Sequence, residues 1–411
     1  MSPLWHRDST PDPWLERFLA GEDAHLDQQL IVHDCRASRA HARMLHGIGI
    51  LNDEELVQLE RGLADIVALA ERNEFPITPQ DEDGHTAIEN FLTARSGEAG
   101  RKIHTGRSRN DQVLTALRLW EKEQIGLLLG ALDKYVEDLE AVSARAGNVG
   151  LPGYTHMQAA MPTTVAMWLG SFAAAALDDV EVLQLALRLV DQCPLGTAAG
   201  FGVPVLPIDR ERVAHEIGFA RVQENPMYAQ LSRGRMEAFL LSGCVQVMHG
   251  LNRLASDLML FTTREFGFVE LPASVCTGSS LMPQKRNADV LELIRASYHV
   301  VRGEESKVQN LTASLISGYN RDVQLTKGPL FAGMGKTLDA LRAMSLVLTG
   351  LRIDDQACAA ALTAELYATE RALTLVAEGM PFRDAYHRVA EDEANRRHRP
   401  LEEPGVHPLI G

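Results

Sequence analysis

The sequence predicts an all-α fold built around a bundle of long helices. Runs of Val, Ile, Thr and Tyr, which favour strands, are scarce, whereas Ala and Leu are abundant. Several long stretches repeat apolar residues every three or four positions, as one buried helix face requires. No fixed repeat marks a solenoid, so we expect the long helices to pack as a bundle.

The longest helical pattern covers residues 111–142. Its apolar stripe begins with Val113, Leu117 and Trp120, at steps of four and three. A helix of this length needs partners of similar length to bury the stripe. Four further stretches provide them, at about residues 163–192, 232–266, 287–311 and 327–351.

The long helices divide the chain into three predicted domains. Shorter helical patterns fill residues 1–106, the five long helices occupy residues 107–352, and one or two short helices follow in residues 353–411. A polar loop at residues 274–288 interrupts the bundle. Asn287 is the predicted N-cap of the helix that follows this loop.

Composition restricts the class of partner. The formal net charge of −15 opposes binding to nucleic acid and to anionic membrane surfaces. No apolar run approaches the roughly 18 residues of a membrane span, and the polar N-terminus is unlike a signal or transit peptide. The five cysteines lack the spacing of a zinc site and fit free thiols in a reducing compartment. We therefore expect a cytoplasmic protein without nucleic-acid or membrane partners.

Polar islands interrupt the helical pattern with residues that hydrophobic cores avoid. Four are clear: "DEDGHTAIEN" at 81–90, "RKIHTGRSRNDQ" at 101–112, "LPGYTHMQAAMPT" at 151–163 and "TGSSLMPQKRNADVLELIR" at 277–295. A weaker one, "SGYNRDVQLTKGP", covers 317–329.

In this order and at this spacing, the islands resemble the argininosuccinate lyase family of the fumarase/aspartase superfamily. "GSSLMPQKRN" resembles the superfamily signature GSSxMPxKxN, and "TGRSRNDQ" and "GYTHMQ" resemble the segments that distinguish argininosuccinate lyases. The similarity extends to "GMPFRDAY" near the C-terminus. It implies a helical three-domain protomer, a homotetrameric helical core, and active sites shared between subunits. A helix longer than thirty residues fits such an oligomer.

The resemblance also implies a reaction, the elimination of fumarate from argininosuccinate to give arginine. This chemistry requires a base, positive charge at the substrate carboxylate and an acid for the departing nitrogen, and no cofactor. Two alternatives remain open. One is a lyase of the same mechanism that acts on another N-substituted succinate, and the other is a non-catalytic structural homologue like the delta-crystallins.

The loop at residues 274–288 matches the catalytic loop of the family. Ser279 is the candidate base, although a serine hydroxyl needs activation by neighbouring donors and positive charge. Lys285 and Asn287 match positions expected to hold and polarise the substrate carboxylate.

A second catalytic group is implied by "GYTHMQ". His156 matches the family histidine that pairs with a glutamate, here Glu292. A carboxylate beside an imidazole raises its basicity and fixes its tautomer, which suits proton transfer. Thr155 is a candidate hydrogen-bond donor beside this pair.

Other residues are candidates for substrate binding. Arg107, Ser108 and Asn110 offer a planar fork, a hydroxyl and an amide, which suit a dicarboxylate. The remaining matches to family substrate-binding positions are Asp27, Tyr319, Gln324 and Lys327.

A few positions leave the substrate detail open. Asp23 stands where many relatives carry Ser, and either Arg233 or Arg235 could fill the role of a family arginine. The role of Arg109 is also left open: it could contact the substrate or be a surface charge. His85 and its helical neighbour at position 89 are spaced like metal ligands, but no third ligand follows, so we predict no metal site.

Overall fold

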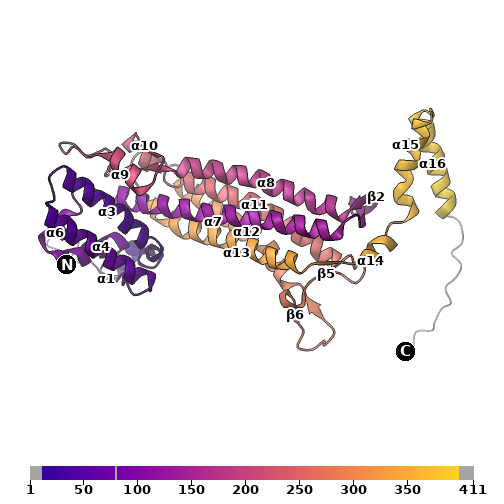
Figure 1. The fold of residues 1–411 in the computed structure, drawn as a ribbon, viewed down its shortest axis with the longest axis horizontal. Helices are drawn as coiled ribbons and strands as arrows, with labels where there is room; N and C mark the ends of the chain where they lie inside the picture. Colours follow the sequence, from indigo (N-terminus) through magenta and orange to yellow (C-terminus); the bar gives the residue numbers. More distant parts are fainter. Residues whose placement is uncertain (1–11, 79–80, 398–411) are drawn as a thin grey trace. The chain divides into compact units, whose positions relative to one another are not determined.

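The computed structural model describes residues 12–78 and 81–397, and long helices dominate it (Figure 1). The predicted all-α fold is confirmed, because every sheet in this part of the chain is a pair of short strands. Parts of the predicted terminal domains, including the tail of the chain, lie outside the described residues. None of the described helices has both the length and the apolar character needed to cross a bilayer.

The five predicted long helices are all present within the described residues. They are α7 (Arg109–Ala146), α8 (Val165–Val190), α11 (Arg235–Phe261), α12 (Asp289–Thr312) and α13 (Lys327–Thr349). The stripe of α7 is buried as expected, with Leu117 and Leu128 each about 1% exposed. Burying this stripe provides most of the stability of so long a helix.

Chain contacts group the protein into two compact units. The first comprises Met1–Tyr135, Ala175–Ala255 and Glu292–Met344, and the second comprises Val136–Ala174, Ser256–Leu291 and Ser345–Gly411. The division into three domains therefore stays a prediction.

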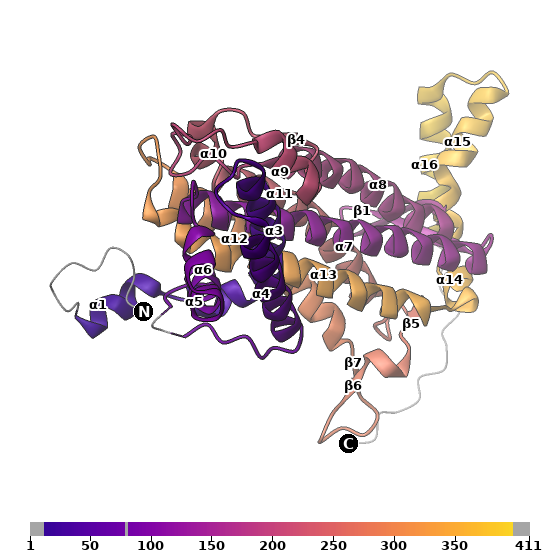
Figure 2. The ribbon, with the colours of Figure 1, turned by 60° about the vertical axis from the view of Figure 1, so that its left-hand side comes forward.

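In the first unit, the long helices run side by side (Figures 1 and 2). Trp120 of α7 packs against Phe331 of α13, with ring centres 4.2 Å apart. Close approach of α13 to α11 depends on Gly333, where an added Cβ would lie 2.5 Å from a methyl carbon of Leu241. These contacts confirm that the helices form a bundle.

The N-terminal segment of the first unit folds into shorter helices. They are α1 (Pro13–Ala20), α2 (Asp23–Leu26), the 3-10 turn η1 (Asp27–Gln29), α3 (Ile31–Gly47), α4 (Asp53–Glu71), α5 (Gly84–Ser96) and α6 (Glu98–Lys102). Asn52 begins α4 with a capping box, in which it exchanges hydrogen bonds with Glu55. A core that includes Leu45 of α3, Leu63 of α4 and Leu92 of α5 joins these three helices.

The rest of the first unit connects the long helices. Its elements are β3 (Gln192–Cys193), α9 (Arg210–Ile217), β4 (Arg221–Val222), α10 (Pro226–Leu231) and the 3-10 turn η3 (Arg321–Thr326). Strands β3 and β4 pair in parallel.

The second unit carries three antiparallel strand pairs. These are β1 (Gly150–Thr155) with β2 (Gln158–Thr164), β5 (Val269–Glu270) with β8 (Arg352–Ile353), and β6 (Thr277–Gly278) with β7 (Arg286–Asn287). Its remaining elements are η2 (Ala273–Val275), α14 (Asp355–Ala360), η4 (Ala364–Tyr367), α15 (Ala368–Ala377) and α16 (Phe382–Arg397).

The predicted N-cap of α12 is wrong. Asn287 lies in β7, opposite Thr277, and the helix begins only at Asp289. The Asn287 amide donates to the Thr277 hydroxyl across the strand pair, at 3.5 Å. The strand pairing therefore keeps Asn287 out of the cap position.

Candidate active site

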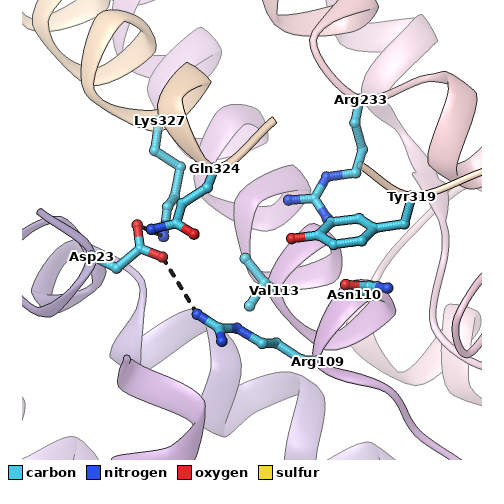
Figure 3. Close-up of a pocket in the computed structure, with 8 residues that line it drawn as sticks. All are labelled: Asp23, Arg109, Asn110, Val113, Arg233, Tyr319, Gln324 and Lys327. Carbon is cyan, nitrogen blue, oxygen red and sulfur yellow. Dashed lines mark ion pairs between the residues drawn. The ribbon is translucent and has the colours of Figure 1, made fainter. Parts of the chain in front are cut away.

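A small polar pocket lies entirely within the first unit (Figure 3). Its walls come from α2, the start of α7, the turn before α11, and the segment that leads through η3 into α13. The lining residues are Asp23, Arg109, Asn110, Val113, Arg233, Tyr319, Gln324 and Lys327. Asp23, Gln324 and Lys327 gather on one side of the pocket, and Arg233 and Tyr319 on the other (Figure 3).

Lys327 is the cation on the first side. Its Nζ lies 2.7 Å from Asp23 Oδ1 and 2.6 Å from Asp27 Oδ1, and all three side chains are buried. Burial raises the pKa of Asp23, and the opposing field of Lys327 only partly offsets that rise. Asp27 Oδ2 also accepts a hydrogen bond from the Gly84 backbone N–H at 3.1 Å.

Arg109 is bound by three carboxylates. Its guanidinium lies 2.6 Å from Asp83 Oδ2, 3.1 Å from Glu82 Oε1 and 3.7 Å from Asp23 Oδ2. Burial alone would raise the pKa of Asp83, but His85 and Arg109 hold it well below its usual range. The sequence does not decide the role of Arg109. The acidic run "DEDG" at 81–84, which contains its partners Glu82 and Asp83, is the signal in the sequence that Arg109 is ion-paired.

The opposite side of the pocket is aromatic and cationic. The guanidinium carbon of Arg233 lies 5.2 Å from the centre of the Tyr319 ring, which is a cation–π contact. Arg233 is buried and lines the pocket, whereas Arg235 is exposed at the start of α11. Burial lowers the pKa of Arg233, against the opposing effects of Tyr319 and Glu237. Arg233 is therefore the arginine that this pocket offers to a ligand.

The N-terminus of α7 orders one edge of the pocket. Ser108 Oγ accepts a hydrogen bond from the Asn110 N–H at 3.2 Å, and the Ser108 N–H donates to Asp111 Oδ1 at 2.9 Å. Arg107 does not line the pocket, because its buried guanidinium donates to Ser38 Oγ at 2.8 Å. Of the predicted residues in "TGRSRNDQ", only Asn110 lines the pocket.

The predicted catalytic loop belongs to the second unit. Ser279 lies between β6 and β7 and is half-buried. Its Oγ accepts hydrogen bonds from the backbone N–H groups of Leu281, at 3.2 Å, and Met282, at 3.0 Å. Lys285 is exposed on the same loop. Two donors therefore converge on the oxygen of the predicted base.

Thr155 and His156 lie at the tip of a hairpin in the second unit. Thr155 pairs with Gln158, so His156 and Met157 form a two-residue turn with φ of 53° and 61°. Residues other than glycine rarely adopt this left-handed backbone conformation. Those that do are often found at functional sites. Glu292 is exposed on α12 in the first unit. The His156–Glu292 pair therefore stays a prediction.

Comparison with known proteins identifies relatives along most of the chain. Residues 15–303 match a family described as lyase. Argininosuccinate lyase of Thermotoga neapolitana is 44% identical over 94% of this chain and 97% of its own. Argininosuccinate lyase of Sorangium cellulosum is 46% identical over 95% of this chain and 90% of its own.

Solved structures show the same fold at lower identity. A class II fumarase from Schistosoma mansoni is 16% identical, with a TM-score of 0.81 over 96% of this chain and 90% of its own. An EDDS lyase in complex with formate is 24% identical, with a TM-score of 0.79 over 95% of this chain and 77% of its own. The chain belongs to the argininosuccinate lyase family within the fumarase/aspartase superfamily.

Proposed function

We propose that the protein cleaves argininosuccinate into arginine and fumarate, and that it serves arginine biosynthesis. The observation that carries this proposal is 44–46% identity to argininosuccinate lyases along nearly the whole chain. The pocket supports it, because three cations, Arg109, Arg233 and Lys327, and one buried carboxylate, Asp23, line its walls. Such a surface is complementary to a substrate that carries both carboxylates and a guanidinium group.

The predicted binding residues have different roles in this proposal. Asn110, Tyr319, Gln324 and Lys327 line the pocket, and Asp27 holds the Lys327 ammonium at 2.6 Å. Arg233 joins the set as a cation for a substrate carboxylate, whereas Arg109 lines the pocket with its charge already met by three carboxylates. Ser108 supports Asn110, and the hydrogen bond from Arg107 to Ser38 favours a supporting role for Arg107.

For the chemical step, Ser279 would remove the proton beside a substrate carboxylate. The two backbone N–H groups that bond to its Oγ support this role, because they would stabilise the deprotonated oxygen. Lys285 and Asn287 would then stabilise the negative charge that develops on the carboxylate.

Proton transfer at the leaving nitrogen would fall to His156. Glu292 would orient its imidazole and raise its basicity, and Thr155 would donate a hydrogen bond beside it. The left-handed turn at His156 supports this role, since it presents the imidazole at the exposed tip of the hairpin.

The assembly we propose is a homotetramer with active sites shared between subunits. Large apolar side chains stay exposed on the long helices, as the core of a helical oligomer would require. They include Leu177 and Leu185 of α8, Leu293 and Val300 of α12, and Leu127 of α7. A cytoplasmic location is supported by the five cysteines, all of which are free.

One experiment tests the reaction. Purified protein is mixed with argininosuccinate, and fumarate is followed by its ultraviolet absorbance. Steady formation of fumarate, with arginine in equal amount, is the expected result. No fumarate from argininosuccinate would refute the proposal.

A second candidate function is a lyase acting on another N-substituted succinate. Asp23 favours it, because a buried carboxylate lines the pocket at a position where the resemblance to the family implies an uncharged Ser. The same assay with other succinyl amines separates the two. Fumarate released from one of them, but not from argininosuccinate, would select the second function.

A further inference from the structure

A buried charge cluster inside the first unit takes no part in the proposed reaction. It consists of Arg118 and Glu121 on α7 and Glu237 on α11, which are 0%, 0% and 1% exposed. Arg118 Nη1 lies 2.7 Å from Glu121 Oε2 and 3.4 Å from Glu237 Oε1. Buried ion pairs are poor sources of stability, because desolvation offsets most of the attraction. The cluster therefore calls for a role other than stabilisation.

The cluster is bonded to the residue that precedes Arg233. Arg118 Nη2 donates to the Ser232 carbonyl oxygen at 3.3 Å. The Ser232 hydroxyl donates to the Ala229 carbonyl oxygen at 2.8 Å and accepts from Gln223 Nε2 at 3.1 Å. Ser232 is fully buried, and these three bonds hold both its backbone and its side chain.

The residue after Arg233 is equally constrained. Gly234 has φ of 75°, and a Cβ at this position would lie 2.2 Å from Thr312 Cγ2. Any other residue would therefore force Thr312 or the turn to move. α11 begins at the next residue and carries Glu237 in its first turn. The backbone of Arg233 is thus fixed on both sides.

The charges of the cluster also connect it to Arg233. One guanidinium, that of Arg118, faces two buried carboxyl groups. Both Glu237 carboxylate oxygens and Glu121 Oε1 lack a hydrogen-bond partner. Glu237 acts on Arg233 electrostatically, opposing the effect of burial on its guanidinium. Arg233 is therefore linked to the cluster electrostatically through Glu237, in addition to the hydrogen bond at Ser232.

We propose that Arg118, Glu121 and Glu237 position Arg233, by fixing the turn at residues 232–234 so that its guanidinium faces an anionic group of the ligand. The choice of argininosuccinate as the test substrate rests on the proposed function, whereas the geometric argument for positioning does not. None of the three cluster residues touches the pocket. They act through Arg233 and are positioning residues.

The test compares Glu237→Gln with Glu305→Gln. Glu305 is a matched control, because it is also buried and ion-paired, to Arg302 on α12, but does not line the pocket. We expect Glu237→Gln to raise KM for argininosuccinate roughly tenfold and to lower kcat by less than about threefold. The control should leave KM unchanged. An unchanged KM in a folded Glu237→Gln protein would overturn the proposal.

A double-mutant cycle separates positioning from general destabilisation. Arg233→Lys should raise KM, and adding Glu237→Gln should raise it little further, because the group to be positioned is already gone. Independent, multiplying effects would contradict the proposal. If Glu237→Gln does not fold, Arg118→Lys, which removes the guanidinium that bonds to the Ser232 carbonyl oxygen, takes its place in both experiments.

Failure of the proposed function is distinguishable in this design. If the wild-type protein releases no fumarate from argininosuccinate, the same variants are compared for succinate binding by calorimetry. Weaker binding in Glu237→Gln, with no change in Glu305→Gln, would support positioning of Arg233 whatever the substrate. Equal binding in all three proteins would overturn it.

Discussion

Replacing Lys327 with Met should leave the buried Asp27 without its cation and the buried Asp23 with only the more distant Arg109, 3.7 Å away. Lys327 lies 2.7 Å from Asp23 and 2.6 Å from Asp27, and the exposed fractions of the three side chains are only 3%, 5% and 4%. Breaking a buried ion pair by removing one partner typically costs about 3–5 kcal/mol. This is a large part of the ~5–15 kcal/mol that stabilises a protein domain.

The size of this loss should depend on pH. Carboxyl groups stranded in the variant bind protons more readily in the folded state than in the unfolded chain. Stability from such groups is present at low pH and is lost as pH rises, so the cost should be largest near pH 8 and smaller near pH 5. The measurement is the free energy of unfolding in urea at both pH values, for wild type and variant.

A matched control and a rescue sharpen this experiment. Lys307→Met removes an exposed lysine of α12 that pairs with Glu304 at 2.8 Å, and should cost ~0–1 kcal/mol. Adding Asp23→Ser to Lys327→Met should recover part of the loss. A cost below ~1 kcal/mol for Lys327→Met, or one equal at both pH values, would refute the reasoning about this buried pair.

Three further predictions concern the loop, a close contact and a buried acid. Ser279→Ala should abolish fumarate formation without changing the oligomer seen by size-exclusion chromatography, and near-normal turnover would overturn the base assignment. Gly84→Ala should destabilise by ~1–3 kcal/mol in urea, because its Cβ would lie 2.9 Å from Ile31 Cδ1; a neutral result would mean that α5 shifts freely. Burial raises the pKa of Glu121 to about 8, so between its ordinary value of 4.5 and about 8 the folded state retains a proton that the unfolded chain releases. Stability from this group is lost as pH rises through that window, and Glu121→Gln should flatten the corresponding fall in Tm; an unaltered slope would contradict this.

The long helices could be predicted because the sequence pattern that specifies a helix is local. Residues 111–142 carry an apolar stripe at helical spacing, and α7 covers Arg109–Ala146. Periodicity of this kind depends only on residues a few positions apart. The same local pattern in the other four stretches predicts a bundle without information on contacts between helices.

The hairpin at His156 could not be predicted in this way. Two-residue turns with positive φ usually contain Asn or Gly, and here His156 and Met157 occupy them. The N-cap assigned to Asn287 was wrong for a related reason, since its partner, Thr277, lies ten residues earlier. Pairing between strands overrode the local capping signal.

The pocket could be predicted only in part. Matches to the family identified Asn110, Tyr319, Gln324 and Lys327, which all line it. The sequence could not show that Arg233 rather than Arg235 reaches it, because that depends on the turn at Gly234. The choice between neighbouring residues depends on tertiary packing.

A crystal structure of the Ser279→Ala protein with argininosuccinate bound would test the proposed chemistry most directly. We predict that the substrate contacts Lys327, Arg233 and Asn110, and that its succinyl half lies beside residue 279 of one subunit and His156. Argininosuccinate bound elsewhere, with this pocket empty and residue 279 remote from the succinyl group, would contradict the proposed active site.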